Sequence, residues 1–256
     1  MSFRGPAPQP DQLRDIRYLF TDIDDTLTTG GRLLPQTFQA LWDLHDAGIA
    51  IVPVTGGSAG CEHIVRTWPV AAVIGESGAF CMTVRDGQVE TEFWDVSELP
   101  GDRQARHLAT VTGMLGHFKL SRDQRFRLAD VAVEIAGHER AEIDALADQI
   151  RGTGASVAVS SIHINSWIGD YNKQTMSARL LERLGVWSEE AMRLAAFVGD
   201  SRNDAPMFSY FPNAFGVANV LSVLDLLDTK PTWITQRPSG LGFADIAETI
   251  LSAKAT

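Results

Sequence analysis

The sequence predicts an α/β fold built on a doubly wound parallel sheet, with a second, smaller α/β domain inserted into it. Short apolar runs alternate with helical patterns toward both ends of the chain, which is typical of a parallel sheet covered by helices on both faces. In the middle of the chain, apolar and polar residues alternate singly, which indicates strands with one polar face. In addition, three predicted strands run directly into clusters of Asp, Thr, Ser and Gly.

The first third of the chain supplies three buried strands and a helix. Strands are predicted over residues 18–20, 49–54 and 70–74, where nearly every residue is apolar. A helix is predicted over residues 35–47, where four side chains recur at helical spacing: Phe38, Leu41, Trp42 and His45. Residues 1–11, which are rich in Pro and Gln, are expected to hang free of the fold.

The middle of the chain, residues 83–171, is predicted to form the inserted domain. A hairpin is expected over residues 80–93, because Asp86-Gly87 lies at the centre of an alternating pattern. Further strands are predicted over residues 126–135 and 157–168, and a helix over residues 139–150.

The buried pattern then resumes. A helix is predicted over residues 173–184, with Gly185 in position to end it. Strands are expected over residues 194–198, 214–217 and 232–235, followed by a last helix over residues 243–251. Residues 1–82 and 172–256 are therefore predicted to form one core, into which residues 83–171 are inserted.

Composition narrows the class of function. The 256 residues carry a formal net charge of −10, which disfavours nucleic acid and anionic membranes as partners. The sequence has neither an apolar run long enough to span a membrane nor the apolar core of a signal peptide. The two cysteines, Cys61 and Cys81, are expected to be buried thiols in a reducing cytoplasm.

Three strands end in polar stretches, at residues 21–26, 55–58 and 199–204. Ligands of open parallel sheets bind beyond the carboxyl ends of the strands, so these stretches are expected to converge at one edge. Asp22 and Asp24 are two residues apart and, in extended backbone, point to the same side. Asp200 and Asp204 add further negative charge.

Such a cluster of carboxylates must either take up protons or bind a cation. Oxygen-only ligands with open positions favour Mg²⁺. The Thr55 hydroxyl and the amides of Gly56 and Gly57 would form a cradle for an oxyanion. Together with Lys173, these groups are the parts needed to hold a phosphoryl group.

These stretches resemble the four motifs of the haloacid dehalogenase superfamily of phosphohydrolases. The corresponding residues here are Asp22-Ile23-Asp24-Asp25-Thr26, Thr55, Lys173, and Gly199-Asp200 with Asn203-Asp204. The long insertion between Thr55 and Lys173 is similar to the α/β cap of the type IIB branch. That branch includes Cof-type sugar phosphatases, sucrose-phosphate, trehalose-phosphate and mannosyl-3-phosphoglycerate phosphatases, and phosphomannomutase. The resemblance implies a Rossmann-like core with a cap.

The resemblance also implies roles for the core residues. Asp22 would be the nucleophile that forms an aspartyl-phosphate, which divides a very slow hydrolysis into two steps. Asp24 would protonate the leaving alkoxide and then deprotonate the attacking water. The phosphoryl oxygens would be held by Thr55, Gly56 and Lys173.

The implied cofactor is Mg²⁺. It would be bound by the side chains of Asp22 and Asp200 and by the main-chain carbonyl of Asp24. Asn203 and Asp204 would bind the waters of the metal or orient Lys173.

The sequence departs from the Cof-type pattern at two places near the expected substrate entrance. Gly57 stands where many of these proteins have Arg, and Glu76-Ser77-Gly78-Ala79 stands where many have Asn-Gly-Ala. Glu76 and Ser77 are therefore candidate substrate contacts. The departures leave the core chemistry unchanged but do not identify the substrate.

The cap supplies further candidates. His163, Asn165 and Trp167 share one face of the strand predicted over residues 157–168. We expect His163, Asn165 and Arg127 to face the core and to contact a polyol or a second anionic group. Trp167 could stack on a sugar ring.

Three functions fit these features. The first is a Mg²⁺-dependent phosphatase acting on a small phosphorylated sugar or glycoside. The second is a phosphomutase, which would return the phosphoryl group to another hydroxyl. The third is a non-enzymatic binding module, against which the presence of Asp22, Asp24, Lys173 and Asp200 argues.

Overall fold

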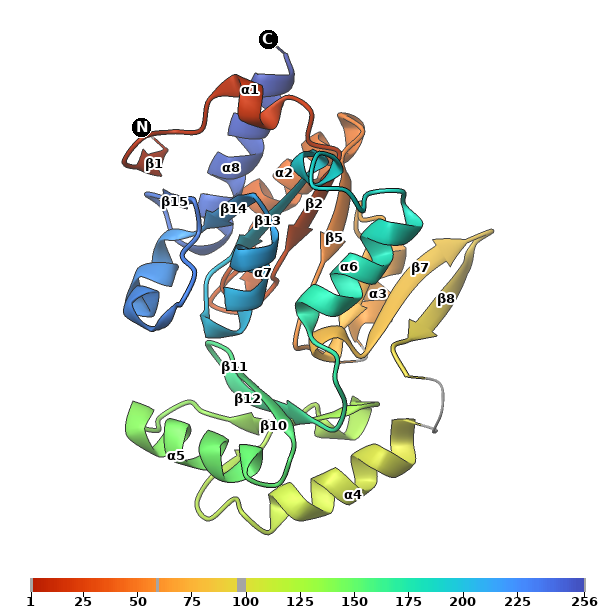
Figure 1. Ribbon diagram of the computed structural model, residues 1–256, viewed down its shortest axis with the longest axis vertical. Coiled ribbons are helices and arrows are strands. Elements are labelled where there is room, and N and C mark those ends of the chain that lie inside the picture. Colours follow the sequence, from red (N-terminus) through yellow and green to blue (C-terminus); the bar gives the residue numbers. More distant parts are fainter. Residues whose placement is uncertain (1, 59, 96–99, 256) are drawn as a thin grey trace.

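The computed structural model describes residues 2–58, 60–95 and 100–255, and its centre is a six-stranded sheet (Figure 1). The strand order is β1-β15-β14-β13-β2-β5. The strands are β1 (Phe3–Arg4), β2 (Tyr18–Thr21), β5 (Ala50–Pro53), β13 (Ala195–Gly199), β14 (Asn213–Gly216) and β15 (Trp233–Thr235). All neighbours are parallel except β1 and β15. The chain winds outward in both directions from β2 and β13, so the predicted doubly wound sheet is confirmed.

Helices cover both faces of this sheet. On one face lie α1 (Pro10–Leu13), α2 (Pro35–Asp46) and α8 (Ser239–Lys254), and on the other lie α6 (Lys173–Arg183) and α7 (Ala205–Tyr210). Successive strand residues point to opposite faces: Leu19 packs in the first core and Phe20 in the second. Within the described residues, no helix is both long and apolar enough to cross a membrane.

A three-stranded antiparallel sheet adjoins the core. It consists of β6 (Ala72–Gly75), β7 (Phe80–Arg85) and β8 (Gln88–Phe93), and helix α3 (Gly60–Thr67) packs against it. The predicted hairpin is present, with Asp86 and Gly87 both at positive φ in its turn. Residue 83 lies inside β7, which pairs with β6. We therefore propose that the inserted domain begins after β8 rather than at residue 83.

The inserted segment forms a four-stranded sheet with strand order β11-β12-β10-β9. Its strands are β9 (Lys119–Leu120), β10 (Asp130–Glu134), β11 (Ser156–Val159) and β12 (His163–Trp167). Helices α4 (Pro100–Thr112) and α5 (Arg140–Arg151) cover the side away from the core (Figure 1). The other side of this sheet faces the carboxyl ends of the core strands. The inserted segment as a whole, the four-stranded sheet with α4 and α5, is called the cap below.

Two predictions for the cap were wrong. Residues 157–168 form two antiparallel strands, β11 and β12, and not one. The Ser160 side chain accepts hydrogen bonds from the amides of Ile162 and His163, which closes a tight turn that the apolar alternation conceals. The strand predicted over residues 126–135 begins only at Asp130, because residues 124–126 form a 3₁₀ turn.

The N-terminus also differs from the prediction. β1 pairs with β15, and Phe3 is buried against Phe215 with a ring-centroid distance of 6.1 Å. A two-residue strand is too short to show any periodicity, so only its partner reveals it. Cys61 and Cys81 are buried free thiols, as predicted.

The remaining elements are short. A small hairpin pairs β3 (Thr28–Thr29) with β4 (Arg32–Leu33). The 3₁₀ turns are η1 (Glu76–Gly78), η2 (Gln124–Phe126), η3 (Ala191–Leu194), η4 (Arg202–Asp204), η5 (Ala218–Ser222) and η6 (Leu224–Leu226).

Candidate active site

The loops after β2 and β13 and the start of α6 meet at one edge of the central sheet. Asp22 directly follows β2, and its amide donates to the carbonyl of Val198 on β13 at 2.9 Å. Lys173 is the first residue of α6, whose start is capped by the side chain of Asn172. The convergence expected from the sequence is therefore present, because parallel strands direct their carboxyl ends to one side.

Lys173 joins two carboxylates. Its Nζ lies 2.6 Å from Oδ1 of Asp22 and 2.8 Å from Oδ1 of Asp204, and all three side chains are buried. Burial disfavours the charged ammonium, but the two carboxylates outweigh it and raise the pKa of Lys173. Lys173 is therefore held as a cation beside Asp22.

Asp22, Asp200 and Asp204 form a buried acidic cluster, with one carboxylate oxygen of each within 4.8 Å of the others. Burial raises the pKa of Asp22 to about 8, with further repulsion from Asp204 and Asp24 against the attraction of Lys173. The pKa of Asp200 is also raised well above its usual value, by burial and then by repulsion from Asp22 and Asp204. One ammonium group does not neutralise three carboxylates, so the cluster fits a divalent cation with oxygen ligands.

The members of the cluster differ in how their oxygens are used. Oδ2 of Asp204 accepts from the amides of Asp200 and Ser201 at 3.0 and 3.1 Å, so this carboxylate is committed to shaping its own loop. Asp200 accepts from the Thr26 hydroxyl at 3.2 Å and from Asn219 Nδ2 at 2.6 Å. Asp204 accepts more hydrogen bonds than Asp22 or Asp200, so the latter two side chains are better placed to hold a metal.

Asp24 lies at the edge of this cluster. It lines a cavity of about 10 Å³ together with Asp22, Gly56 and His163, enough for about one water molecule. Burial raises the pKa of Asp24, and the attraction of Lys173 offsets this in part. A carboxyl group with a raised pKa beside the expected nucleophile is suited to donating and accepting a proton.

The Thr55 loop borders the same cavity through Gly56. Thr55 is buried, and its Oγ1 accepts a hydrogen bond from the amide of Gly57 at 2.8 Å. The carbonyls of Thr55 and Gly57 accept from the amides of Ser77 and Glu76 at 3.0 and 2.9 Å. The loop is therefore tied to the turn that follows β6.

That turn buries Glu76 against the cap. Glu76 is fully buried, and its carboxylate accepts from the backbone amides of residues 128–130 in the cap, at 2.6 to 3.0 Å. Burial and the charge of Asp130 raise its pKa to about 8, against the effect of these three amides. Glu76 and Ser77 both adopt positive φ, a conformation that is strained for residues other than Gly and Asn.

Arg127 and Asn165 are likewise committed to other protein groups. Arg127 donates to Asp123, Asp130 and the carbonyl of Gly56, and its side chain is only 1% exposed. Asn165 donates to Asp130 and to the same carbonyl. We therefore expect Glu76, Arg127 and Asn165 to hold the cap against the core rather than to contact substrate.

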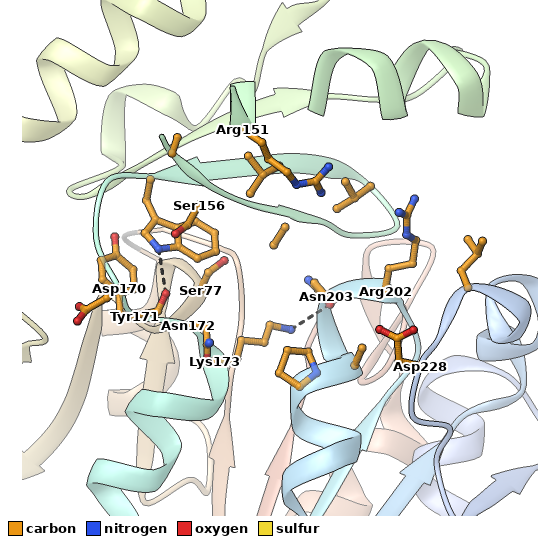
Figure 2. Close-up of a pocket in the computed structure, with 18 residues that line it drawn as sticks. Ser77, Arg151, Ser156, Asp170, Tyr171, Asn172, Lys173, Arg202, Asn203 and Asp228 are labelled. Atoms are coloured by element: carbon orange, nitrogen blue, oxygen red, sulfur yellow. Dashed lines mark hydrogen bonds between the residues drawn. The ribbon is translucent and has the colours of Figure 1, made fainter. Parts of the chain in front are cut away.

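Two other predicted residues border open space. His163 lines the small cavity beside Asp22 and Asp24. Ser77 lines a larger cavity of about 530 Å³ between cap and core, and its buried hydroxyl has no hydrogen-bond partner among the described residues. Figure 2 shows Lys173 and Asn203 on the core side of this cavity and Arg151 of α5 on the cap side. Trp167 lies on its wall, with its Nε1 donating to the Tyr171 carbonyl at 2.9 Å.

Comparison with known proteins identifies the fold. No family model and no curated protein matches this chain. A solved structure from Thermoplasma acidophilum is 16% identical, with a TM-score of 0.70, over 92% of this chain and 98% of that one. The sucrose-phosphatase from Synechocystis, solved with sucrose and phosphate, is 18% identical, with a TM-score of 0.69, over 94% and 98%. A Bacteroides thetaiotaomicron protein described among the HAD superfamily phosphatases is 18% identical, with a TM-score of 0.64, over 97% and 99%.

The chain has the haloacid dehalogenase fold. The likeness at these identities is one of fold, and it confirms the fold that the sequence motifs predict. Within the haloacid dehalogenase fold, the structure brings together Asp22, Lys173, Asp200 and Asp204, with Asp24 and Gly56 at the adjoining cavity.

The sequence analysis missed two residues that contact Asp200. Asn219 donates to its carboxylate and also to the carbonyl of Asp25 at 3.0 Å. Asn219 follows β14, the neighbour of β13, so the rule that ligands gather beyond strand ends could have found it. Thr26 belongs to the first motif, but the sequence does not indicate its hydrogen bond to Asp200.

Proposed function

We propose that this protein is a Mg²⁺-dependent phosphomonoester hydrolase in which Asp22 is the nucleophile. The observation that carries the proposal is the position of the Asp22 carboxylate, 2.6 Å from a buried lysine and within the acidic cluster of Asp200 and Asp204. Such a site pairs a nucleophilic oxygen with positive charge where a phosphoryl group would lie. The haloacid dehalogenase fold adds to this support.

The chemistry follows from the residues. An oxygen of Asp22 attacks phosphorus, the bond to the leaving oxygen breaks, and protonated Asp24 donates its proton to that alkoxide. Asp24 then accepts a proton from water as the water oxygen attacks phosphorus, which releases phosphate and restores Asp22. Lys173 and the Thr55 hydroxyl hold the phosphoryl oxygens during both steps.

The metal would be held by Asp22, Asp200 and the main-chain carbonyl of Asp24. When bound, Mg²⁺ supplies positive charge that offsets the negative charge of the phosphoryl oxygens. Asn203 accepts from Lys173 Nζ at 3.4 Å and would help to orient that side chain. Asp204, which binds the same ammonium more closely, would do the same.

We further propose a small phosphorylated sugar or glycoside as substrate. The cavity of about 530 Å³ beside Lys173 is large enough for a mono- or disaccharide and carries polar groups on its wall, the unpartnered Ser77 hydroxyl among them. The structurally similar sucrose-phosphatase was solved with sucrose and phosphate, which supports the same substrate class.

The decisive experiment measures phosphate release from a panel of sugar phosphates with Mg²⁺ and with EDTA. Asp22→Asn is expected to lower kcat about a thousandfold or more, because the amide cannot form the acyl-phosphate. Asp43→Asn, on the exposed face of α2, makes the same charge change and serves as the control. Turnover by Asp22→Asn at the wild-type rate would contradict the nucleophile assignment. Isomerised sugar phosphate without phosphate release would indicate a phosphomutase instead.

A further inference from the structure

The Gly56 carbonyl is a point at which the cap contacts the backbone of the Thr55 loop. Its oxygen accepts from Arg127 Nη1 at 2.8 Å and from Asn165 Nδ2 at 3.2 Å. Both donors belong to the cap, whereas the carbonyls of Thr55 and Gly57 are held by amides of the core. Among the described residues, the orientation of the Gly56–Gly57 peptide thus depends on the cap.

We propose that Arg127 and Asn165 are positioning residues that orient the Thr55 hydroxyl through this single peptide. The inference rests on the proposed function, in which that hydroxyl binds a phosphoryl oxygen. It extends that function by making the closed cap part of the phosphate-binding loop.

The geometry of one peptide carries the effect. A trans peptide is planar, with its carbonyl and its amide pointing in opposite directions. Fixing the Gly56 carbonyl toward the cap therefore fixes the Gly57 amide, which donates to Thr55 Oγ1 at 2.8 Å. Because that oxygen already accepts a hydrogen bond, the proton of the Thr55 hydroxyl is left free to be donated to a phosphoryl oxygen.

The loop needs such a restraint because two of its residues are glycines, which have the greatest backbone freedom. A side chain at either position would also crowd the contacts. A Cβ on Gly56 would lie 3.1 Å from Oδ1 of Asn165, and a Cβ on Gly57 would lie 3.1 Å from Oγ1 of Thr55. The two glycines therefore allow Asn165 and Thr55 to approach the loop closely, but they leave its backbone flexible. The hydrogen bonds from the cap restrict that flexibility.

The donors are themselves held firmly. Arg127 Nη1 lies 2.8 Å from Oδ1 of Asp130, and its Nε and Nη2 donate to Asp123 at 3.1 and 3.0 Å. Asn165 Nδ2 also donates to Asp130, at 2.8 Å. A buried network whose members are all hydrogen-bonded is rigid, so it can transmit the position of the cap to Gly56.

Glu76 completes the connection from the core side. Its carboxylate binds the amides of residues 128–130, which adjoin Arg127 and include Asp130, and its own amide donates to the Gly57 carbonyl. Glu76 thus holds the Gly57 carbonyl directly. It also holds the cap segment next to Arg127, whose side chain binds the Gly56 carbonyl.

A double-mutant cycle on kcat and kcat/KM tests the inference, with Asn165→Ala, Thr55→Ala and the double variant. Asn165→Ala alone is expected to lower kcat about ten- to a hundredfold with little change in KM. In the Thr55→Ala background it is expected to lower kcat/KM less than about twofold, because the hydroxyl that it orients is already gone. Additive losses, or wild-type kcat for Asn165→Ala, would overturn the inference.

Two further variants separate positioning from general docking of the cap. Asp144→Ala removes a hydrogen bond of 2.7 Å between core and cap, from Arg202 Nη1 to Asp144 Oδ1, without touching Gly56 or the groups that hold Arg127. It is expected to retain wild-type kcat, and a loss equal to that of Asn165→Ala would contradict the inference. Arg127→Lys keeps the charge but cannot donate to Gly56, Asp123 and Asp130 at once. It is expected to lower kcat, and to lower it much less in the Thr55→Ala background. If circular dichroism shows that Asn165→Ala is unfolded, Arg127→Lys takes its place in the double-mutant cycle.

The inference and the proposed function fail in distinguishable ways. If the wild-type protein with Mg²⁺ hydrolyses no phosphomonoester, the proposed function fails and the inference falls with it. If it turns over and the cycle is additive, only the inference is overturned. Inhibition by orthovanadate gives a second readout, and Asn165→Ala is expected to weaken it at least tenfold while Asp144→Ala does not.

Discussion

Two largely buried clusters in this protein have similar composition and different consequences. The site cluster contains Asp22, Asp200, Asp204 and one cation, Lys173, and the cluster between cap and core contains Glu76, Asp123, Asp130 and one cation, Arg127. Each therefore has three carboxyl groups and one positive charge. The difference lies in the other hydrogen-bond donors that surround the carboxylates.

In the cluster between cap and core, N–H and O–H donors satisfy the carboxylates. For the partly exposed Asp123, burial acts to raise the pKa, but hydrogen bonds from Ser121, Arg127 and Ser58 and the charge of Arg127 bring it below the usual value. For the fully buried Glu76 and Asp130, burial still keeps the pKa raised. In the site cluster, Lys173 is the one donor to the Asp22 carboxylate among the described residues. The comparison teaches that a buried acidic cluster is suited to a ligand at the carboxylate with the fewest hydrogen-bond donors, here Asp22, and not merely because the cluster is acidic.

The largest expected effect, on the free energy of unfolding, comes from removing the cation of the cluster between cap and core. Arg127→Met leaves Asp123 and Asp130 without their cation and should reduce the free energy of unfolding by about 3–5 kcal/mol. Urea unfolding followed by circular dichroism measures it. A loss below about 1 kcal/mol would show that this cluster does not hold the cap, and would remove the contrast drawn here.

The next effect comes from removing a charge from the site cluster, which should stabilise the metal-free protein rather than destabilise it. Asp200→Asn is expected to cost about a hundredfold in kcat and to abolish the stabilisation by added Mg²⁺. Without metal it should raise the free energy of unfolding by about 1 kcal/mol, because it removes a repulsive charge whose pKa burial and neighbouring carboxylates raise. Thermal unfolding with and without Mg²⁺ tests both parts. A large loss of stability without metal would mean that the two clusters are equivalent.

The smallest effect concerns a buried group that has no charged partner among the residues the structure describes. His107 in α4 lies 2.8 Å from the Ser166 hydroxyl through its Nε2, and burial lowers its pKa below 6.5. Below pH 6.5 the unfolded chain therefore binds a proton that the folded chain binds less well, so stability falls as the pH falls. His107→Gln should reduce this loss between pH 7 and 5 by about 1 kcal/mol in urea unfolding. An unchanged pH dependence would contradict it.

Much of the fold could be predicted from local pattern. The central strands and the helices α2 and α6 lie close to their predicted bounds. Strands buried on both faces are continuous apolar runs, and helices buried on one face have apolar residues at a period of about 3.6. The elements that failed lack that signal. β1 has two residues, and the turn at Ser160 depends on side-chain hydrogen bonds that interrupt an apparently continuous strand.

By itself, the sequence determined that Asp22, Thr55 and Asp200 follow buried strands, and therefore that they reach one edge of the sheet. The tertiary structure alone decided which polar side chains stay available there. Glu76, Arg127 and Asn165 each have a hydrogen-bond partner 52 to 109 residues away, and Asn219 contacts Asp200 because β14 lies beside β13. Local patterns record how deeply a residue is buried, but the hydrogen-bond partner of a buried polar group depends on which distant segments the fold brings into contact with it.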